Sequence, residues 1–368
     1  MSHLLIACGG TGGHLAPGIA LAEMLQARGH TCTLLISRKQ IDSVLIKKYS
    51  HLDFYKIEGQ GFAGGLLKKA VFFWRAFMGC IQSYKLLGAK NADFVILFGG
   101  YLSLGLGIAA RLKGVPIALH EANCVPGRSI RLLKRLAMRI YIPEGISAKG
   151  FPEQRLKRFG YPIRSEIKHY PKAEARKRLG ITVSNKLLVI IGGSQGAAVL
   201  NQWTIKHLEA LSKMGISVYC ITGFGKTPEI VSESESADHS VTFVPFSDQM
   251  GDVISAGDLV ISRAGAGSIA EIVRCRAPAI LIPYPYAADN HQQANARMHE
   301  QHGAGIVLDE DNLNALLSEV KRLIFDEKLL DDFKSAMKHL DRFDSASLIA
   351  DDIEGMLAER ASAKIQSD

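Results

Sequence analysis

Two glycine-rich turns, each directly after a run of apolar residues, lie half a chain apart in this sequence. Residues 4–8 lead into the turn 9–14, and residues 187–191 lead into the turn 192–197. A strand that ends in glycines and feeds a helix brings bare backbone N–H groups, and the positive end of the helix dipole, to an anionic group. The duplication predicts two nucleotide-fold units, facing each other across a cleft for two substrates.

Length and patterning agree with this prediction. The chain has 368 residues, more than one hydrophobic core usually supports. Apolar runs alternate with amphipathic stretches, which is typical of parallel α/β sheets with crossover helices. We expect a hinge at residues 160–164, so that one domain comprises 1–163 with a C-terminal helix at about 344–368, and the other comprises 164–343. The predicted strands are 4–8, 31–36, 94–98, 117–121, 139–142, 187–191, 218–222, 241–245, 259–262 and 279–283.

The cysteines and the N-terminus indicate a cytoplasmic protein without a metal site. Six cysteines are scattered without a C-x-x-C pair, and no histidine cluster has metal-ligand spacing. The first predicted strand begins within three residues of Met1, which leaves no room for a signal peptide. The longest uncharged stretch, 94–110, is broken by glycines and falls short of the ~20 residues of a membrane span. We expect no cofactor.

The basic residues are concentrated in the N-terminal half. The net charge of +8 is compatible with nucleic acid, an anionic membrane surface or a phosphorylated substrate as partner. Residues 66–90 and 128–139 contain several lysines and arginines and no acid, and the first stretch also carries Trp74 and Phe77. Such a helix suits an anionic bilayer, although a core-packing helix with a basic edge fits as well. Nucleic acid is disfavoured because no recognition motif accompanies the charge.

Several chemically useful side chains follow predicted strands in the first half. His14 lies at a helix start, where an imidazole could take a proton from an attacking hydroxyl or simply bond a neighbouring loop. Tyr101 follows the Gly-Gly turn after strand 94–98, and His120 and Glu121 close strand 117–121. Because parallel strands end at one edge of a sheet, these residues are expected to share one rim. His120 and Glu121 could also be an ordinary strand-capping pair.

The second half offers a donor-binding pattern. Strand 259–262 leads to a run of small residues and then to Glu271. Small residues let a diphosphate approach the helix N-terminus, and Glu271 could accept hydrogen bonds from ribose hydroxyls or act as a helix-dipole partner. The polar cluster 289–295, which contains Gln292 and Gln293, supplies donors and acceptors suited to sugar hydroxyls.

These motifs, in this order, are similar to those of a known family. GGTGGH, GGY-x-S, HE-x-N, YPIR, GGSQGA and SRAGAGSIAE followed by DNHQQ-x-N resemble the MurG family, the UDP-N-acetylglucosamine:undecaprenyl-diphospho-muramoyl-pentapeptide N-acetylglucosaminyltransferases. The resemblance extends from Gly9 to Asn295. The chain departs from the family pattern at Ala122, Tyr161, 103–105 and 246–250.

The resemblance implies a GT-B fold of two Rossmann-like domains and a peripheral enzyme on the cytoplasmic face of the bacterial inner membrane. The enzyme would move GlcNAc from UDP-GlcNAc to the C4 hydroxyl of a lipid-linked muramoyl-pentapeptide, with inversion. Other cell-wall synthesis proteins are further expected partners.

The resemblance also implies roles for particular residues. His14 would be the base, with Glu121 and His120 as other catalytic candidates, and Tyr101 would contact substrate. Arg164 and Asn123 would help to fix the donor, whose base would lie near Phe246 and Ser247. The glycine turn at the acceptor side comprises Thr11, Gly12 and Gly13; the diphosphate and ribose would contact Ser194, Gln195, Ala266, Gly267, Ser268, Ile269, Ala270 and Glu271; the GlcNAc hydroxyls would contact Gln292 and Gln293.

Three other functions stay open at this point. A UDP-sugar epimerase would use the same donor site without a lipid acceptor. A nicotinamide oxidoreductase is less favoured because neither glycine turn reads G-x-G-x-x-G. A non-catalytic UDP-sugar-binding subunit would bind the nucleotide sugar without turnover.

Overall fold

The computed structural model describes residues 1–9, 12–37, 46–57, 66–181, 185–193, 196–226 and 241–365. The chain divides into two compact units. Unit 1 comprises Met1–Ala122, Pro126–Arg164 and Arg342–Asp368, and unit 2 comprises Asn123–Val125 and Ser165–Asp341. The sequence predicts boundaries after residues 163 and 343, whereas the units change over after Arg164 and Asp341.

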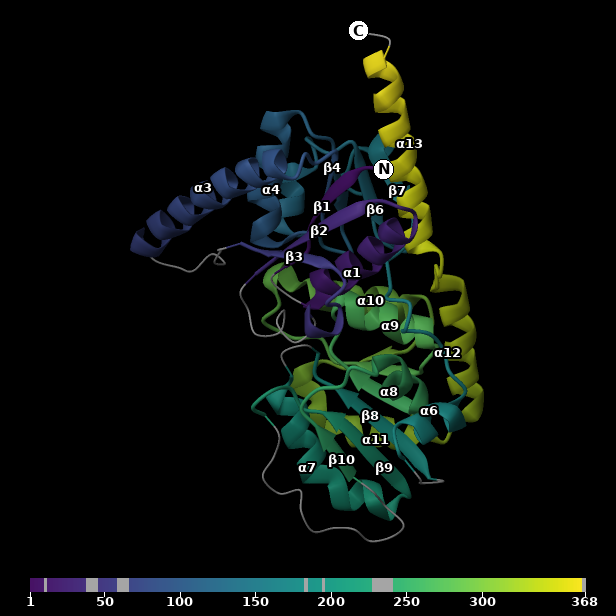
Figure 1. The fold of residues 1–368 in the computed structure, drawn as a ribbon. Coiled ribbons are helices and arrows are strands. Elements are labelled where there is room, and N and C mark those ends of the chain that lie inside the picture. The colour runs from purple at the N-terminus through teal and green to yellow at the C-terminus, as the bar shows by residue number, and fades with distance from the viewer. Residues whose placement is uncertain are drawn as a thin grey trace. The chain divides into compact units, whose positions relative to one another are not determined.

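Unit 1 contains a seven-stranded parallel sheet in the order β3-β2-β1-β4-β5-β6-β7 (Figure 1). This arrangement is the nucleotide-fold order, in which the first strand is central and the chain crosses over to the other side at β4. The strands are β1 (His3–Ala7), β2 (Thr31–Ile36), β3 (Asp53–Lys56), β4 (Phe94–Leu97), β5 (Ile117–His120), β6 (Arg139–Ile142) and β7 (Leu156–Arg158). The helices are α1 (Gly12–Ala27), α3 (Leu66–Ala89), α4 (Gly100–Lys113), α5 (Arg128–Leu133), η1 (Glu153–Arg155) and α13 (Ser345–Ile365).

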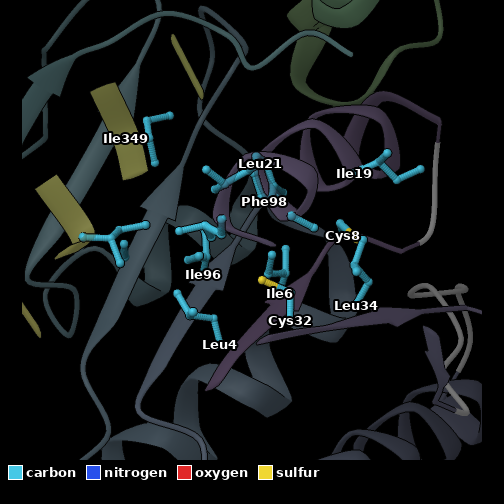
Figure 2. Packing of buried hydrophobic residues seen from close by; sticks show 14 of the residues in the cluster. Leu4, Ile6, Cys8, Ile19, Leu21, Cys32, Leu34, Ile96, Phe98 and Ile349 are labelled. Carbon is cyan, nitrogen blue, oxygen red and sulfur yellow. The ribbon is translucent and has the colours of Figure 1, made fainter. Parts of the chain in front are cut away.

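One core of unit 1 lies between the sheet and the helices α1 and α13 (Figure 2). Alternate residues of β1 project to one face of the sheet, which places Leu4 and Ile6 against α1. The predicted C-terminal helix is present as α13, and its apolar residues at helical spacing, Ile349 and Ile353 among them, are buried in this core. At the end of α1, Arg28 donates hydrogen bonds to Glu354 and Ser347 of α13. The C-terminal helix therefore belongs to unit 1.

Unit 2 repeats the same topology with a six-stranded parallel sheet in the order β10-β9-β8-β11-β12-β13. Its strands are β8 (Lys186–Ile191), β9 (Ile216–Ile221), β10 (Val241–Val244), β11 (Leu259–Ser262), β12 (Ala279–Leu281) and β13 (Ile306–Val307). Its helices are α6 (Lys172–Arg178), α7 (Ala198–Lys213), α8 (Met250–Ala256), α9 (Ala266–Cys275), η2 (Ala288–Asn290), α10 (His291–Gln301), η3 (Glu310–Ala315), α11 (Leu316–Ile324) and α12 (Glu327–Leu340).

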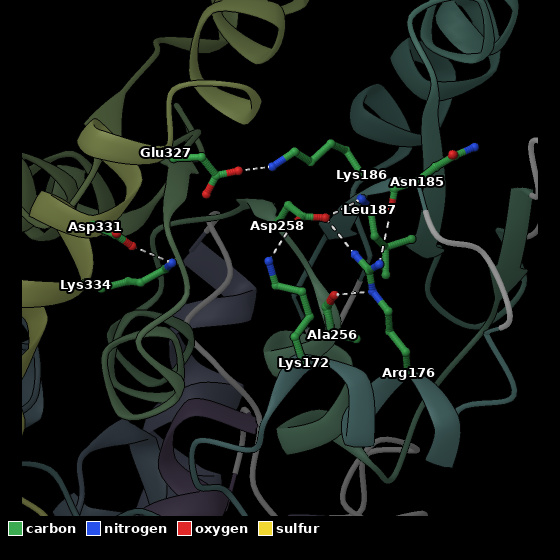
Figure 3. Close-up of polar contacts among 10 residues, drawn as sticks. All are labelled: Lys172, Arg176, Asn185, Lys186, Leu187, Ala256, Asp258, Glu327, Asp331 and Lys334. Carbon is green, nitrogen blue, oxygen red and sulfur yellow. Dashed lines mark hydrogen bonds and ion pairs between the residues drawn. The ribbon is translucent and has the colours of Figure 1, made fainter.

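A buried carboxylate attaches α6 to this sheet (Figure 3). Asp258, just before β11, accepts hydrogen bonds of 2.6 Å each from the backbone N–H of Leu187 and from Nη2 of Arg176. Lys172 also donates to it. Burial raises the pKa of this carboxyl, but the hydrogen bonds and charges of Lys172, Leu187 and Arg176 outweigh burial and hold the pKa below its usual 3.8. Asp258 is therefore an ionised anchor.

All the predicted strands are confirmed, and the described residues contain three further strands that the sequence did not predict. These strands are β3, β7 and β13. β3 and β7 are the two edge strands of the seven-stranded sheet, and β13 is one edge strand of the six-stranded sheet. None of them has a fully buried run of residues. Edge strands bury fewer side chains than central ones, so the apolar signal that marks the central strands is weak there.

Candidate functional site

In unit 1, His14 lies against the glycine turn that follows β4. A Cβ added at Gly99 would be 3.2 Å from Cε1 of His14, and one added at Gly100 would be 3.7 Å from Cδ2. Both glycines have positive φ angles, 103° and 75°, which other residues rarely adopt. The predicted convergence of His14 with the turn after strand 94–98 is confirmed, and the half-buried imidazole packs over bare backbone. Tyr101 follows on α4, half-buried.

His120 occupies the interior of the same edge of the sheet. Its side chain is 2% exposed, and its ring packs against Phe98, with centroids 5.1 Å apart, and edge-on against Tyr161 at 5.8 Å. Nε2 donates a hydrogen bond of 3.0 Å to the carbonyl of Gly160. Burial, with a smaller contribution from the nearby His14, outweighs the hydrogen bond to Gly160 and lowers the pKa of His120 from 6.5 to about 4. His120 is thus a neutral, packed imidazole at neutral pH.

Glu121 and Arg164 are also directed into unit 1. Glu121 is buried, and its Oε2 accepts a hydrogen bond of 2.7 Å from the backbone N–H of Gly127. This bond closes the loop between β5 and α5. Arg164 is buried as well, and its Nη1 lies 3.4 Å from the hydroxyl of Tyr49. Gly12 and Gly13 begin α1, whereas Thr11 lies outside the described residues.

In unit 2, small residues form the start of α9. Gly265, the N-cap of the helix, has no side chain that could cap its first N–H groups. Ala266, Gly267 and Ser268 are half-buried and small, so a phosphate could approach the backbone. Ile269 faces the core, and Ala270 and Glu271 are half-buried.

Arg263, directly before this turn, is directed away from the helix start. Its Nη1 lies 3.3 Å from the carbonyls of both Ile282 and Pro283, and its guanidinium pairs with Glu310. The arginine therefore braces the loop after β12 and leaves the mouth of α9 to small residues.

The second glycine turn packs tightly against its surroundings. A Cβ at Gly192 would be 2.3 Å from the amide nitrogen of Ala197, and one at Gly196 would be 2.2 Å from the carbonyl of Thr222. At Gly193, with φ of 78°, none of the described residues beyond its chain neighbours comes within 4 Å of an added Cβ. Ser194 and Gln195 lie outside the described residues.

The amides of the 289–295 cluster divide into two groups. Gln292 and Gln293 are half-buried; Oε1 of Gln292 accepts from the N–H of Tyr284 at 3.0 Å, and Nε2 of Gln293 donates to Asp309 at 2.9 Å. Asn295 is fully turned into the protein, which corrects the expectation that the whole cluster serves a sugar.

Asn295 holds a segment that the sequence analysis assigned to the donor. Its Nδ2 donates to Oδ1 of Asn123 at 3.1 Å and to the carbonyl of Ala264 at 3.2 Å, and its Oδ1 accepts from the N–H of Cys124 at 2.9 Å. Asn295 thereby joins Asn123 to the turn before α9. Its buried position on the inner side of α10 follows from packing, so the amide-rich composition alone did not distinguish it from its neighbours.

An aromatic pair follows β9 and β10. Phe246 stacks on Phe224 with centroids 5.4 Å apart and an interplanar angle of 16°. Ser247 accepts a hydrogen bond from the N–H of Gln249 at 3.1 Å. Since β10 and β9 are neighbours in the sheet, this pair lies at the same strand ends as the glycine turn after β8.

The surface of α3 bears exposed aromatic residues. Trp74 is 64% exposed and Phe77 58%, and their rings lie 6.3 Å apart. The side chains at 66–73, 75 and 76, which include the predicted basic positions there, lie outside the described side chains. In the described part of the chain, no helix is long and apolar enough to span a bilayer. Over the same residues, no group of three or more His, Cys, Asp or Glu could hold a metal, and none of the six cysteines forms a disulfide.

Comparison with known proteins places both units in one family. Residues 4–142 match the glycosyltransferase family 28 N-terminal domain, and residues 187–348 match its C-terminal domain. The UDP-N-acetylglucosamine--N-acetylmuramyl-(pentapeptide) pyrophosphoryl-undecaprenol N-acetylglucosamine transferase of Opitutus terrae is 47% identical over 97% of this chain and 95% of its own length. The protein of the same name from Caldanaerobacter subterraneus is 34% identical over 93% of this chain and 96% of its own.

Solved structures agree in fold. The crystal structure of Acinetobacter baumannii MurG matches with a TM-score of 0.71 and 24% identity, covering 96% of this chain and 100% of that one. The calicheamicin glycosyltransferase CalG4 matches with a TM-score of 0.72 and 15% identity over 98% of this chain and 99% of its own. These matches confirm the predicted GT-B fold. The relatives of known name, which are N-acetylglucosamine transferases, do not favour the epimerase alternative. The chain belongs to the MurG family, the UDP-N-acetylglucosamine-dependent N-acetylglucosaminyltransferases of peptidoglycan synthesis.

Proposed function

We propose that this chain transfers GlcNAc from UDP-GlcNAc to the C4 hydroxyl of the MurNAc unit of undecaprenyl-diphospho-MurNAc-pentapeptide, with inversion. The bond from the anomeric carbon to UDP breaks as the bond to the acceptor oxygen forms. The observation that carries the proposal is the start of α9, which follows β11 at the strand ends, has a glycine as its N-cap and has small residues in its first turn. The names of relatives such as that of Opitutus terrae supply the substrates.

On the donor side, the site must stabilise negative charge that builds on the departing diphosphate. The N–H groups and dipole of α9 at Ala266, Gly267 and Ser268 are suited to this task. Glu271, further along the same helix, would accept hydrogen bonds from the ribose hydroxyls. Ser194 and Gln195 would assist at the diphosphate.

The GlcNAc and the uracil of the donor would be held beside the diphosphate. Gln292 and Gln293 follow β12, the neighbour of β11, so their free amide atoms would meet the GlcNAc hydroxyls. The uracil would lie by Phe246 and Ser247, at the end of β10. Asn123, fixed by Asn295, and Arg164 would complete the donor contacts.

On the acceptor side, we propose His14 as the general base. It is half-buried at the glycine-lined edge of the sheet, whereas His120 is enclosed and Glu121 is occupied by the N–H of Gly127. Thr11, Gly12, Gly13 and Tyr101 would line the acceptor near the transferred sugar. His14 would take the proton of the C4 hydroxyl as the new bond forms.

The proposed acceptor is linked to a membrane lipid, so the protein must reach the membrane surface to bind it. We propose that the exposed Trp74 and Phe77 on α3, with the basic residues of 66–90 and 128–139, bind the cytoplasmic face of the inner membrane. The large exposed fractions of these two rings, in a stretch of sequence rich in lysine and arginine, favour an anionic bilayer surface over a core role for them. Contacts with other cell-wall synthesis proteins belong to the same proposal.

The direct test follows UDP release from UDP-GlcNAc with and without a lipid-diphosphate muramoyl-pentapeptide acceptor. We expect UDP release only with the acceptor, together with a disaccharide product on the lipid. Acceptor-independent conversion of the UDP-sugar would indicate an epimerase, and nucleotide-sugar binding without turnover would indicate a binding subunit. Either result would contradict the proposal.

A further inference from the structure

The helix that carries His14 contains a proline in its interior. Pro17 lies within α1, the helix Gly12–Ala27, and it is buried. In an α-helix the N–H of each residue donates to the carbonyl four residues earlier, and proline has no N–H. Pro17 therefore removes the helical hydrogen bond that the carbonyl of Gly13 would otherwise receive. The turn that loses this bond is the one that holds His14.

Tyr161 supplies a donor to that same carbonyl. Its hydroxyl donates a hydrogen bond of 3.0 Å to the carbonyl oxygen of Gly13, 148 positions away in the sequence. The tyrosine is 6% exposed, and its ring lies edge-on against His120 at 5.8 Å. His120 is itself held by the carbonyl of Gly160, the residue next to Tyr161. Packing thus fixes the direction in which the hydroxyl points.

The bond fixes the backbone directly before His14. Gly12 and Gly13 give this turn little conformational restraint of their own, because glycine has the widest backbone freedom. The imidazole must nevertheless keep its place over Gly99 and Gly100 to meet an acceptor hydroxyl. A tertiary hydrogen bond at Gly13 restrains the turn where the helical bond is missing.

We propose that Tyr161 is a positioning residue for the transfer reaction, whose hydroxyl replaces the helical hydrogen bond that Pro17 removes and so holds the His14 turn. The inference rests on the proposed function in that His14 acts as the base. Tyr161 itself touches neither substrate nor reacting atoms in this account; it acts through Gly13.

The test is a double-mutant cycle of Tyr161→Phe and Pro17→Ala. Tyr161→Phe deletes only the hydroxyl and keeps the ring against His120. Pro17→Ala restores a backbone N–H that can donate to Gly13. The measurements are kcat and the KM for UDP-GlcNAc with a lipid-diphosphate muramoyl acceptor, and the thermal midpoint of each variant without substrate.

In the wild-type background we expect Tyr161→Phe to lower kcat about tenfold and to change the KM for UDP-GlcNAc less than about twofold, because misplacing a catalytic group affects the chemical step. In the Pro17→Ala background, Tyr161→Phe should lower kcat less than about threefold, because the N–H of residue 17 then donates the helical hydrogen bond to the carbonyl of Gly13. Rescue of this kind is specific to the missing helical bond, and a merely structural role of the ring would not produce it.

Two results would overturn the inference: an unchanged kcat in Tyr161→Phe, or an equal loss in both backgrounds. If Tyr161→Phe alone does not fold, the double variant should fold, and failure of both would count against the inference. The thermal midpoints test it independently of turnover, since Tyr161→Phe should lower the midpoint less in the Pro17→Ala background. A wild-type protein without UDP release would refute the proposed function, but the comparison of thermal midpoints would still test whether the Tyr161 hydroxyl replaces the helical hydrogen bond.

Discussion

The Nε2 atom of His120 lies 3.0 Å from the carbonyl oxygen of Gly160 and joins the end of β5 to the segment after β7. Since a carbonyl only accepts, the neutral imidazole carries its proton on Nε2. Burial lowers the pKa of this ring to about 4, with a smaller contribution from His14. The residue next to the proposed catalytic edge is therefore a neutral packing group.

His120 should make the fold sensitive to acid. The unfolded chain binds a proton at this side chain below about pH 6.5 and the folded chain only below about pH 4, so stability falls as the pH drops through that interval. Between pH 7.5 and pH 5 we expect a loss of about 2 kcal/mol from this group, measured by urea unfolding. His120→Phe should lose this part of the pH dependence, although the unpaired Gly160 carbonyl costs about 1–3 kcal/mol at every pH.

A second histidine offers an independent check of that reasoning. Burial lowers the pKa of His299, in unit 2, to about 4 as well. His299→Leu should therefore also reduce the difference in stability between pH 7.5 and pH 5. A pH dependence that is identical in wild type and both variants would contradict the account of either histidine.

Replacing the proposed general base, His14, should slow turnover without weakening the binding of UDP. We expect His14→Ala to lower kcat by about 100-fold, because general-base catalysis contributes about that much. The Kd for UDP, measured by calorimetry, should stay within about twofold, since UDP is proposed to bind unit 2. His30→Ala is the control: this imidazole contacts Glu354 of α13 and should not affect kcat. Wild-type turnover in His14→Ala would move the role of base to Glu121 or His120.

Glu271 should act mainly on donor binding. Replacing its carboxylate by an amide weakens the hydrogen bonds proposed to the ribose hydroxyls, so Glu271→Gln should raise the KM for UDP-GlcNAc about tenfold and change kcat by less than about threefold. Glu319→Gln is the matched control, because Glu319 pairs with Arg322 on α11, outside the proposed site. An unchanged KM in Glu271→Gln would assign this carboxylate to the helix dipole instead.

The central strands could be predicted because they leave a simple signal in the sequence. In β1, β4, β8 and β11 nearly every residue is buried, so each appears as a continuous apolar run. β3 reads Asp-Phe-Tyr-Lys and is largely exposed at the edge of its sheet. Its pairing with β2 depends on a register between distant segments, which no local pattern records.

The candidate site also has features that the sequence predicts and features that depend on the tertiary structure. The glycine turns and His14 follow strands, so topology alone brings His14 to the turn at Gly99 and Gly100. The direction of Asn295 depends on which side of α10 faces the turn before α9, and the bond from Tyr161 to Gly13 spans 148 positions. Pro17 was a local signal of the missing helical bond, but only the fold identifies the group that replaces it.

Removing the buried anchor of α6 should destabilise unit 2. Asp258→Ala leaves Lys172, Arg176 and the N–H of Leu187 without their shared acceptor, and breaking a buried ion pair by deleting one partner costs about 3–5 kcal/mol. Asp331→Ala is the control (Figure 3), since Asp331 pairs with Lys334 at 2.9 Å on an exposed face of α12 and its loss should cost less than about 1 kcal/mol. Urea unfolding at pH 7.5 measures both; equal effects would mean that Asp258 is no anchor.

The exposed aromatic residues of α3 allow membrane binding to be separated from catalysis. Trp74→Glu with Phe77→Glu places charge where the proposed contact needs apolar groups, so the variant should lose sedimentation with anionic vesicles. Turnover of a short, water-soluble acceptor should stay within about twofold, because both side chains are exposed on the surface. Phe343→Glu, at another exposed aromatic residue in unit 1, should leave both properties unchanged. Equal loss of vesicle binding and of soluble turnover would show that Trp74 and Phe77 support the fold and not a membrane contact.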